Sequence, residues 1–286
     1  MSNTIWKILF GFVGLRRIIL QENNICFKVQ IVDECNLNCK GCDHFSPLAK
    51  KWHQPLDDFI SMIKALKEKT DGNIKEIVLY GGEPLLHENL LNIIFATNVI
   101  LPNIHLTVET NGILLMDFLD KHYSKLKKIN LEWKITEYLP TKGIVQKIKN
   151  KYCKLNIAIT KQFIKEEVNA NYNLPYKTHL FKININTHND KDKAESNFSH
   201  CYVKTHETNS IVLRDWKLYP CPITACIDIL NNDYVIPAID LHDNINFEMI
   251  LSTANNKCDF CGRCGLIEYG LPYEISSKDV SEWYLK

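Results

Sequence analysis

Strand-like and helix-like segments alternate through the first two thirds of this 286-residue chain, and this alternation constrains the fold most. Strands are predicted at residues 26–32, 76–80, 104–110, 129–136, 154–160 and 179–184. Helices are predicted from Leu56 to Leu66 and near residues 87–100, 113–123 and 142–151, where apolar residues recur at helical spacing. A strand followed by a helix, repeated about six times, forms right-handed βαβ units around a parallel sheet. The predicted fold class is therefore α/β.

Polar and cysteine-bearing loops directly follow several of these strands. The segment CNLNCKGC (residues 35–42) follows the first strand, and GGEP (residues 81–84) follows the second. Residues 109–111 close the third strand, and residues 136–138 form the exit of the fourth. Because the carboxyl ends of parallel strands meet at one edge of a sheet, we expect these loops to gather where such folds bind their ligands.

The number and grouping of the cysteines favour metal binding over disulfides. The chain has 11 cysteines and a net charge of +1. Disulfide frameworks are usually found in short secreted chains, whereas pairs at x2 spacing in a long chain suit metal ligation. We therefore expect a reducing, cytoplasmic location. The near-zero net charge gives no whole-molecule reason to expect nucleic acid as a partner.

The opening segment, residues 1–25, is predicted to be a helix and not a membrane span. Lys7, Arg16 and Arg17 interrupt its apolar run, so it falls short of the roughly 18 consecutive apolar residues that a span requires. Its charges follow the apolar part, unlike those of a signal peptide. We expect it to pack on the main domain or on a partner, with weak membrane contact as the alternative.

The first cysteine group offers three soft ligands at C-x3-C-x2-C spacing: Cys35, Cys39 and Cys42. A structural zinc site requires four protein ligands, and His44 or a distant cysteine could supply the fourth. The alternative is a [4Fe–4S] cluster held at three corners, which leaves one iron open to a small molecule. An open coordination position is what separates a catalytic from a structural metal site.

This cysteine motif after a first strand, with GGEP after a second, resembles the radical S-adenosylmethionine (SAM) superfamily. The resemblance covers about residues 27–184. It implies a partial (β/α)6 TIM-like barrel over residues 26–190, in which a [4Fe–4S] cluster and SAM generate a 5′-deoxyadenosyl radical that abstracts a hydrogen atom from the substrate. It also implies a reducing partner such as flavodoxin or ferredoxin.

The resemblance assigns roles to individual positions. Cys35, Cys39 and Cys42 match the cluster ligands. The loop of Gly81, Gly82, Glu83 and Pro84 matches the one that receives the methionine amino group, which a carboxylate suits. The polar set that meets the ribose or carboxylate of SAM is matched by Glu109, Thr110 and Asn111. The family often has a large residue just before the third cysteine, where this chain has Gly41. Adenine packing is therefore expected from elsewhere, with Phe45 as the candidate.

A second cysteine group lies in residues 191–286, which are predicted to form a small cysteine-rich C-terminal domain. Its six members are Cys201, Cys221, Cys226, Cys258, Cys261 and Cys264. This region resembles the SPASM and twitch extensions of the superfamily, although it lacks the seven-cysteine SPASM pattern. The resemblance implies one auxiliary [4Fe–4S] cluster, and a zinc ribbon is the alternative. A cysteine left over from such a cluster could donate a hydrogen atom to a substrate radical.

Three functions stay open from the sequence. The first is modification of a peptide after translation by radical SAM chemistry. The second is the same chemistry, as an oxidoreductase or an epimerase, on a sugar or another small polar metabolite. The third is a non-catalytic zinc-binding protein. Polar residues expected near a substrate are His44, Lys134, Glu137, Tyr138 and Lys182.

Overall fold

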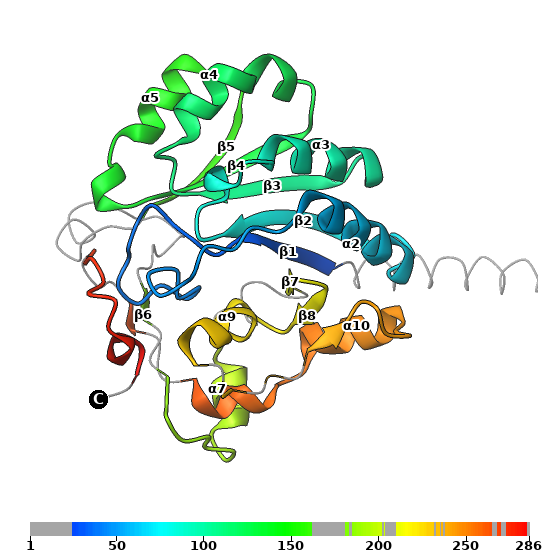
Figure 1. Ribbon diagram of the computed structural model, residues 1–286, viewed down its shortest axis with the longest axis vertical. Coiled ribbons are helices and arrows are strands. Elements are labelled where there is room, and N and C mark those ends of the chain that lie inside the picture. The colour runs from blue at the N-terminus through cyan, green and yellow to red at the C-terminus, as the bar shows by residue number, and fades with distance from the viewer. Residues whose placement is uncertain are drawn as a thin grey trace, which may run out of the picture.

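The computed structural model describes residues 25–161, 181–182, 185–201, 203, 210–231, 233–234, 236, 238–264, 268–269 and 273–284. All but the last residue of the predicted N-terminal helix lie outside this part. Within it, the chain forms an eight-stranded sheet with helices on both sides (Figure 1). No helix of the described residues is long and apolar enough to cross a membrane.

The first five strands of the sheet are parallel and follow one another along the chain. They are β1 (Ile25–Val32), β2 (Ile74–Gly81), β3 (His105–Thr110), β4 (Leu131–Glu137) and β5 (Asn156–Lys161). Each pairs in parallel with the next. The prediction of a parallel α/β sheet is confirmed, and it places the exits of these strands at one edge.

Four helices connect these strands and cover one face of the sheet (Figure 1). They are α2 (Leu56–Lys69), α3 (Leu90–Ile100), α4 (Leu115–Leu126) and α5 (Ile144–Lys151). Short 3-10 helices, η1 (Pro84–Leu86) and η2 (Leu139–Thr141), follow β2 and β4. Every predicted helix of this region is present.

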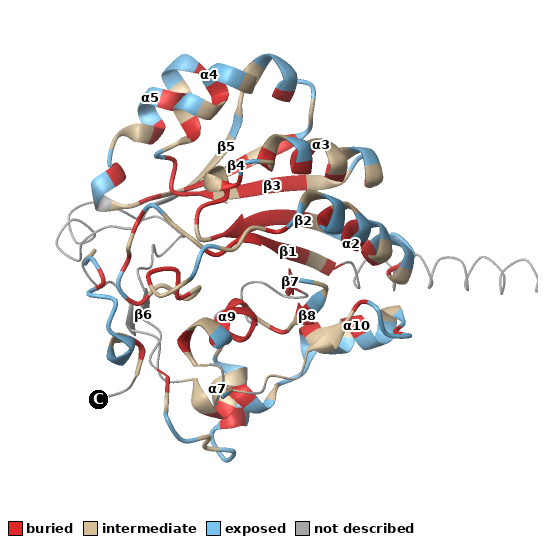
Figure 2. Ribbon diagram, viewed as in Figure 1, coloured by how far each residue is buried: buried red, intermediate tan, exposed pale blue. Residues whose placement is uncertain are grey.

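The two faces of the strands differ in chemistry. In β1, Phe27, Val29 and Ile31 are fully buried in the main hydrophobic core with the helices, and Figure 2 shows how completely the central strands are covered. The alternate residues Lys28 and Gln30 are also buried, and they lie on the opposite face because side chains alternate along a strand. The inner face of β1 is therefore polar although it is shielded from solvent, whereas Val78 and Val212, which lie beside Lys28, belong to a second hydrophobic cluster.

The prediction that residues 179–184 form a sixth strand of the parallel sheet is wrong. The described part of this segment, β6 (Phe181–Lys182), pairs antiparallel with β10 (Glu268–Tyr269) and not with β5. The position beside β1 is taken instead by β7 (Ser210–Arg214), which runs parallel to it. A two-residue strand can exchange only a few ladder hydrogen bonds, so its partner is set by tertiary contacts and not by its own sequence.

The C-terminal region extends the sheet and builds a second core. A hairpin lies near Arg214: β7 turns through two residues with positive φ into β8 (Lys217–Tyr219), and β9 (Ile239–Asp240) follows. The remaining elements are α7 (Ala194–Ser199), α9 (Pro222–Leu230), α10 (Phe247–Asn255), η3 (Asp259–Arg263) and η4 (Val280–Trp283). A separate C-terminal domain stays a prediction, because β7 belongs to the main sheet.

Candidate functional site

The cysteine loop, defined here as residues 33–46, is tied to the exit of β2. The amide of Gly82 donates to the Val32 carbonyl at 2.9 Å, and the amide of Glu83 donates to the Glu34 carbonyl at 2.9 Å. The two loops that carry the predicted cluster and SAM residues therefore lie against each other at the carboxyl edge of the sheet.

Both glycines of the GGEP turn are required by this close approach. A Cβ atom on Gly81 would lie 2.1 Å from the Val32 carbonyl oxygen, and one on Gly82 would lie 2.1 Å from the Glu34 carbonyl oxygen. Gly81 also has a φ of 150°, which side chains rarely allow. The two glycines therefore let the end of β2 approach the cysteine loop.

Glu83 is fully buried and joins the exits of β2 and β3. Its carboxylate accepts hydrogen bonds from the Thr110 hydroxyl at 2.6 Å, the Asn111 amide at 2.9 Å and the Leu85 amide at 3.1 Å. Burial raises the pKa of Glu83 to about 6, although these three donors act to lower it. The Glu83 carboxylate therefore holds the loops after β2 and β3 together.

Asn111 connects this network to the first cysteine. Its Nδ2 donates to Asn36 Oδ1 at 2.7 Å and approaches the Cys35 sulfur at 3.8 Å, while its Oδ1 accepts from the Ile113 amide. The sequence prediction grouped Cys35, Glu83 and Asn111 around one ligand. The structure brings all three together.

The three thiols of the motif lie close enough to influence one another. Burial and the charges of Cys42 and Glu83 raise the pKa of Cys35 to about 12, although hydrogen bonds to it act to lower the value. Burial and the charges of the other two cysteines also raise the pKa of Cys39 well above its ordinary value. A metal ion reverses this effect, because thiols that coordinate a metal are deprotonated. Two neighbouring thiols that resist ionisation, with the Cys42 thiol beside them, fit a soft, cationic metal site.

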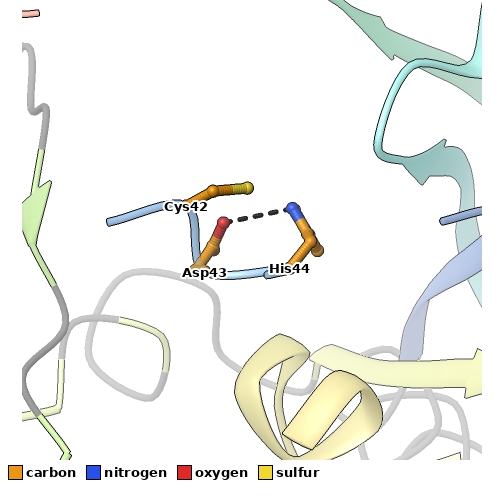
Figure 3. Close-up of side chains that lie close together, drawn as sticks. All are labelled: Cys42, Asp43 and His44. Carbon is orange, nitrogen blue, oxygen red and sulfur yellow. Dashed lines mark ion pairs between the residues drawn. The ribbon is translucent and has the colours of Figure 1, made fainter. Parts of the chain in front are cut away.

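Cys42, Asp43 and His44 form a compact group whose ligand atoms all lie within 4.8 Å of one another (Figure 3). Asp43 Oδ1 pairs with His44 Nδ1 at 3.1 Å. Burial acts to lower the pKa of His44, but Asp43 and Cys42 raise it to about 9. A histidine that ligates a metal commonly donates its other ring N–H group to a carboxylate, and the Nε2 atom of His44 is buried without a hydrogen-bond partner, so the zinc alternative stays open at this position.

Glu109 is held by lysines on the inner face of the sheet. Lys134 Nζ lies 2.6 Å and Lys28 Nζ 3.9 Å from Glu109 Oε1. Burial acts to raise the pKa of Glu109, but the two lysines lower it to about 2. Glu109 was predicted to meet SAM and Lys134 a substrate; the structure pairs them with each other across β3 and β4.

The exit of β4 places one of its two predicted residues beside the cysteines. Tyr138 is within reach of their charge, since burial and then Cys39, Cys42 and Cys35 raise its pKa well above the ordinary value. The Glu137 side chain instead accepts a hydrogen bond from the backbone amide of Gly143 at 2.9 Å.

Of the remaining predicted residues, Phe45 has a different role and the Lys182 side chain is not described. Phe45, the candidate for adenine packing, is a fully buried core residue that packs on Trp283 with ring centroids 6.0 Å apart. The side chain of Lys182 lies outside the described residues.

Several polar residues near the site were missed by the sequence prediction. Lys28 and Tyr80 lie side by side, with Lys28 Nζ 5.9 Å from the centre of the Tyr80 ring. The Tyr80 hydroxyl is buried without a hydrogen-bond partner. Its ring also contacts His44, with centroids 5.0 Å apart. The alternation of polar and apolar residues along the strands was the signal that could have identified this inner face.

Five of the six C-terminal cysteines act on one another. Burial raises the pKa of Cys264, and the charges of Cys221, Cys261 and Cys201 raise it further. The sulfurs of Cys258 and Cys261 lie 3.7 Å apart. These five residues are called the second cysteine site below. The Asn197 side chain fixes their backbone by donating to the Cys261 and Cys264 carbonyls at 2.9 and 2.8 Å. None of the 11 cysteines, all of which are described, forms a disulfide.

Cys226 lies apart from the second cysteine site. It is fully buried, and its sulfur donates to Gln30 Oε1 on the inner face of β1 at 2.9 Å. Burial raises the pKa of Cys226 well above its ordinary value, and Arg214 and Asp33 are the charged groups that act on it most. A ligand role shared by all six cysteines stays a prediction that this placement does not support.

Comparison with known proteins identifies one family model and a set of relatives. Residues 29–135 match the model for the Radical SAM superfamily. A GTP 3',8-cyclase from Campylobacter jejuni is 24% identical over 259 residues, which cover 85% of this chain and 78% of the relative. A GTP 3',8-cyclase from Clostridium perfringens is 30% identical over 169 residues, covering 52% of this chain and 51% of the relative.

Solved structures superpose loosely. BtrN in complex with AdoMet and 2-DOIA gives a TM-score of 0.49 at 14% identity, covering 91% of this chain and 98% of BtrN. Streptococcus suis SuiB bound to the precursor peptide SuiA gives a TM-score of 0.41 at 10% identity, covering 92% of this chain and 77% of SuiB.

Proposed function

Since the chain belongs to the radical SAM superfamily through residues 29–135, we propose that Cys35, Cys39 and Cys42 hold a [4Fe–4S] cluster that binds SAM. When bound, the cluster and SAM supply a 5′-deoxyadenosyl radical that abstracts a hydrogen atom from the substrate. The observation that carries this proposal is the hydrogen-bonded connection from Cys35 through Asn111 to Glu83. It joins the three loops that the chemistry requires at one edge of the sheet.

The protein's own residues hold and orient the reacting groups. The three thiolates would be the iron ligands, and because the loop has no fourth cysteine, one coordination position would stay available to SAM. Glu83 and Asn111 keep the GGEP turn and the β3 exit against the cysteine loop. The polar inner face of β1, with Lys28, receives the substrate. The surrounding core excludes water, which protects a radical from side reactions.

We infer that the substrate is a small, oxygen-rich polar metabolite such as a sugar or nucleotide. The inner face presents charged groups and the unpartnered Tyr80 hydroxyl, which suit hydroxyl and phosphate oxygens better than apolar peptide side chains. Relatives named GTP 3',8-cyclase support a nucleotide as the first compound to test. A peptide substrate is the second reading and is included in the experiment.

An auxiliary cluster at the second cysteine site belongs to the same proposal. Four of Cys201, Cys221, Cys258, Cys261 and Cys264 would ligate one [4Fe–4S] cluster, which leaves one of the five in reserve. The Asn197 bonds to two of the carbonyls fix the ligand loop, as residues around a metal site commonly do. The reducing equivalents would come from a protein such as flavodoxin or ferredoxin.

The test is anaerobic reconstitution with iron and sulfide, followed by reduction with SAM in deuterated buffer. We expect a brown protein that releases 5′-deoxyadenosine, and a Cys39→Ala variant that does not. The exposed Cys153 lies outside both cysteine sites, so Cys153→Ala is the matched control. Addition of GTP, nucleotide sugars and peptides in turn should identify the compound that increases turnover. A colourless protein that binds zinc and leaves SAM intact would contradict the proposal.

A further inference from the structure

The C-terminal strap, defined here as residues 273–284, runs along the cysteine loop although the two are more than 220 residues apart in the chain. In Figure 1 it is the red segment beside the blue loop that follows β1. Cys39 and Ile275 form an antiparallel bridge. The Lys40 amide donates to the Glu274 carbonyl at 2.9 Å. The strap therefore pairs with the backbone of a predicted iron ligand.

The pairing with the cysteine loop continues along the strap, and further hydrogen bonds join two parts of the strap to each other. The Ser276 amide donates to the Asn38 carbonyl at 2.8 Å. Glu282 then accepts from the Ser276 hydroxyl at 2.7 Å and from the Ser277 amide at 2.8 Å. These bonds fold the strap back on itself, so that its end returns to the cysteine loop.

Trp283 anchors that end. Its ring is fully buried, and its Nε1 donates to the Cys42 carbonyl at 2.9 Å. Its edge packs on Phe45 with ring centroids 6.0 Å apart. A buried tryptophan normally requires a partner for its N–H group, and here the partner is the third cysteine of the motif.

The other end of the strap lies beside Cys39, because Tyr273 directly precedes Glu274, whose carbonyl accepts from the Lys40 amide. Burial and the charges of the other two cysteines of the motif raise the pKa of Cys39, and Tyr273 acts to lower it. The Tyr273 ring also packs against Tyr138, with centroids 6.0 Å apart. Hydrogen bonds to cluster sulfurs are among the factors that set reduction potential.

The strap also connects the two cysteine sites. The Ile185 amide donates to the Trp283 carbonyl at 2.7 Å, and Ile185 forms an antiparallel bridge with Cys264. Two hydrogen-bonded steps thus lead from Cys42 through Trp283 to Ile185, and the bridge completes the route to the second site. Fixing the strap fixes both sites relative to each other.

We propose that the C-terminal strap is a positioning element of the cluster site: it holds the cysteine loop ready for metal, and Tyr273 donates a hydrogen bond to the Cys39 sulfur. The first part concerns the protein without metal. The second part rests on the proposed function, because it requires that Cys39 ligates a cluster.

The first part is tested on the metal-free chain by hydrogen exchange of the amides in residues 36–46. Trp283→Phe keeps an aromatic ring but removes the donor to the Cys42 carbonyl, so exchange of the Lys40 amide should accelerate roughly fivefold, the effect of one lost hydrogen bond. Trp216→Phe, in the β7–β8 turn, is the matched control and should leave these amides unchanged. Equal exchange rates in wild type and Trp283→Phe would overturn the positioning role.

The second part is tested by redox titration of the reconstituted protein, monitored by electron paramagnetic resonance. Loss of a hydrogen bond to a ligand sulfur disfavours the more negative, reduced cluster. Tyr273→Phe should therefore shift the midpoint potential to a more negative value at unchanged iron content. Tyr152→Phe, which loses a hydroxyl bond to Asp120 far from the loop, should not. An unshifted potential in Tyr273→Phe would refute the Tyr273 role. A wild-type protein that takes up no iron would refute the proposed function and leave the exchange result standing.

Discussion

The two cysteine sites are built in opposite ways. Cys35, Cys39 and Cys42 come from one continuous loop that follows a buried parallel strand. The second cysteine site collects residues from three separate segments: one after α7, one at the start of α9 and one around η3. The first site is local in sequence, whereas the second exists only once the C-terminal region has folded.

This difference determines how each site is supported. The first is held mainly by the sheet, because the GGEP turn and the β3 exit end at the same edge. The second is held by side chains from outside its own ligand loop, such as Asn197, and by the packing of Gly262 against Asn189. We therefore expect the first site to tolerate changes in residues 191–264, outside the strap, better than the second tolerates changes around Asn197.

The largest effect should come from removing a ligand of the first site. Cys39→Ala should abolish formation of 5′-deoxyadenosine and lower the iron content by about four atoms per chain, the content of one cluster. Iron analysis and chromatography of the reaction mixture measure both quantities. Retention of full iron content with loss of activity would mean that Cys39 acts in some way other than ligation.

Cysteine replacements in the C-terminal region should show that Cys226, unlike the second cysteine site, does not bind iron. Cys258→Ala should lower the iron content by about four atoms and leave SAM cleavage measurable. Cys226→Ala should leave the iron content unchanged and reduce the free energy of unfolding by about 1 kcal/mol, because it removes a buried sulfur bonded to Gln30. If Cys226→Ala lowers the iron content as much as Cys258→Ala, the division into five plus one is wrong.

A matched pair of glycine substitutions tests the backbone support of each site. In Gly82→Ala the added Cβ would lie 2.1 Å from the Glu34 carbonyl oxygen, and in Gly262→Ala 2.3 Å from Asn189 Oδ1. Each clash should reduce the free energy of unfolding by about 1–3 kcal/mol, measured with urea. Gly82→Ala should impair SAM cleavage, whereas Gly262→Ala should impair iron uptake at the second site. Gly72→Ala, where nothing lies near the added Cβ but φ is 73°, measures the cost of backbone strain without a clash.

The smallest effect should be a change in the pH dependence of stability when Glu109 is replaced. The pKa of Glu109 is lowered to about 2, so its ion pairs stabilise the fold above the ordinary carboxyl pKa near 4.5 and are lost as the pH falls toward 2. Glu109→Gln should flatten the decline in unfolding free energy over that window. The pKa of Glu83 is raised to about 6, so its contribution has the opposite sign and decreases as the pH rises from about 4.5 to 6. Identical pH profiles for wild type and Glu109→Gln would contradict the assignment.

Much of the first site could be predicted because its signals are short-range. A strand followed directly by C-x3-C-x2-C, and a second strand followed by GGEP, fix the order of the loops. The parallel sheet then brings Cys35, Glu83 and Asn111 together without further information. The pairing of Glu109 with Lys134 could not be predicted, because it depends on which residues of β3 and β4 lie opposite each other.

The sequence by itself determined the parallel sheet, the edge at which its loops meet and the three cysteines that follow the first strand, because hydrophobic period and residue spacing act over a few residues. Tertiary structure alone decided that β7 flanks β1 and that β6 pairs with β10 outside the main sheet. It also decided that Cys226 faces Gln30 and that residues 273–284 cover the cysteine loop. These choices join segments far apart in the chain. They depend on which surfaces bury and hydrogen-bond best together, and no local pattern encodes that comparison.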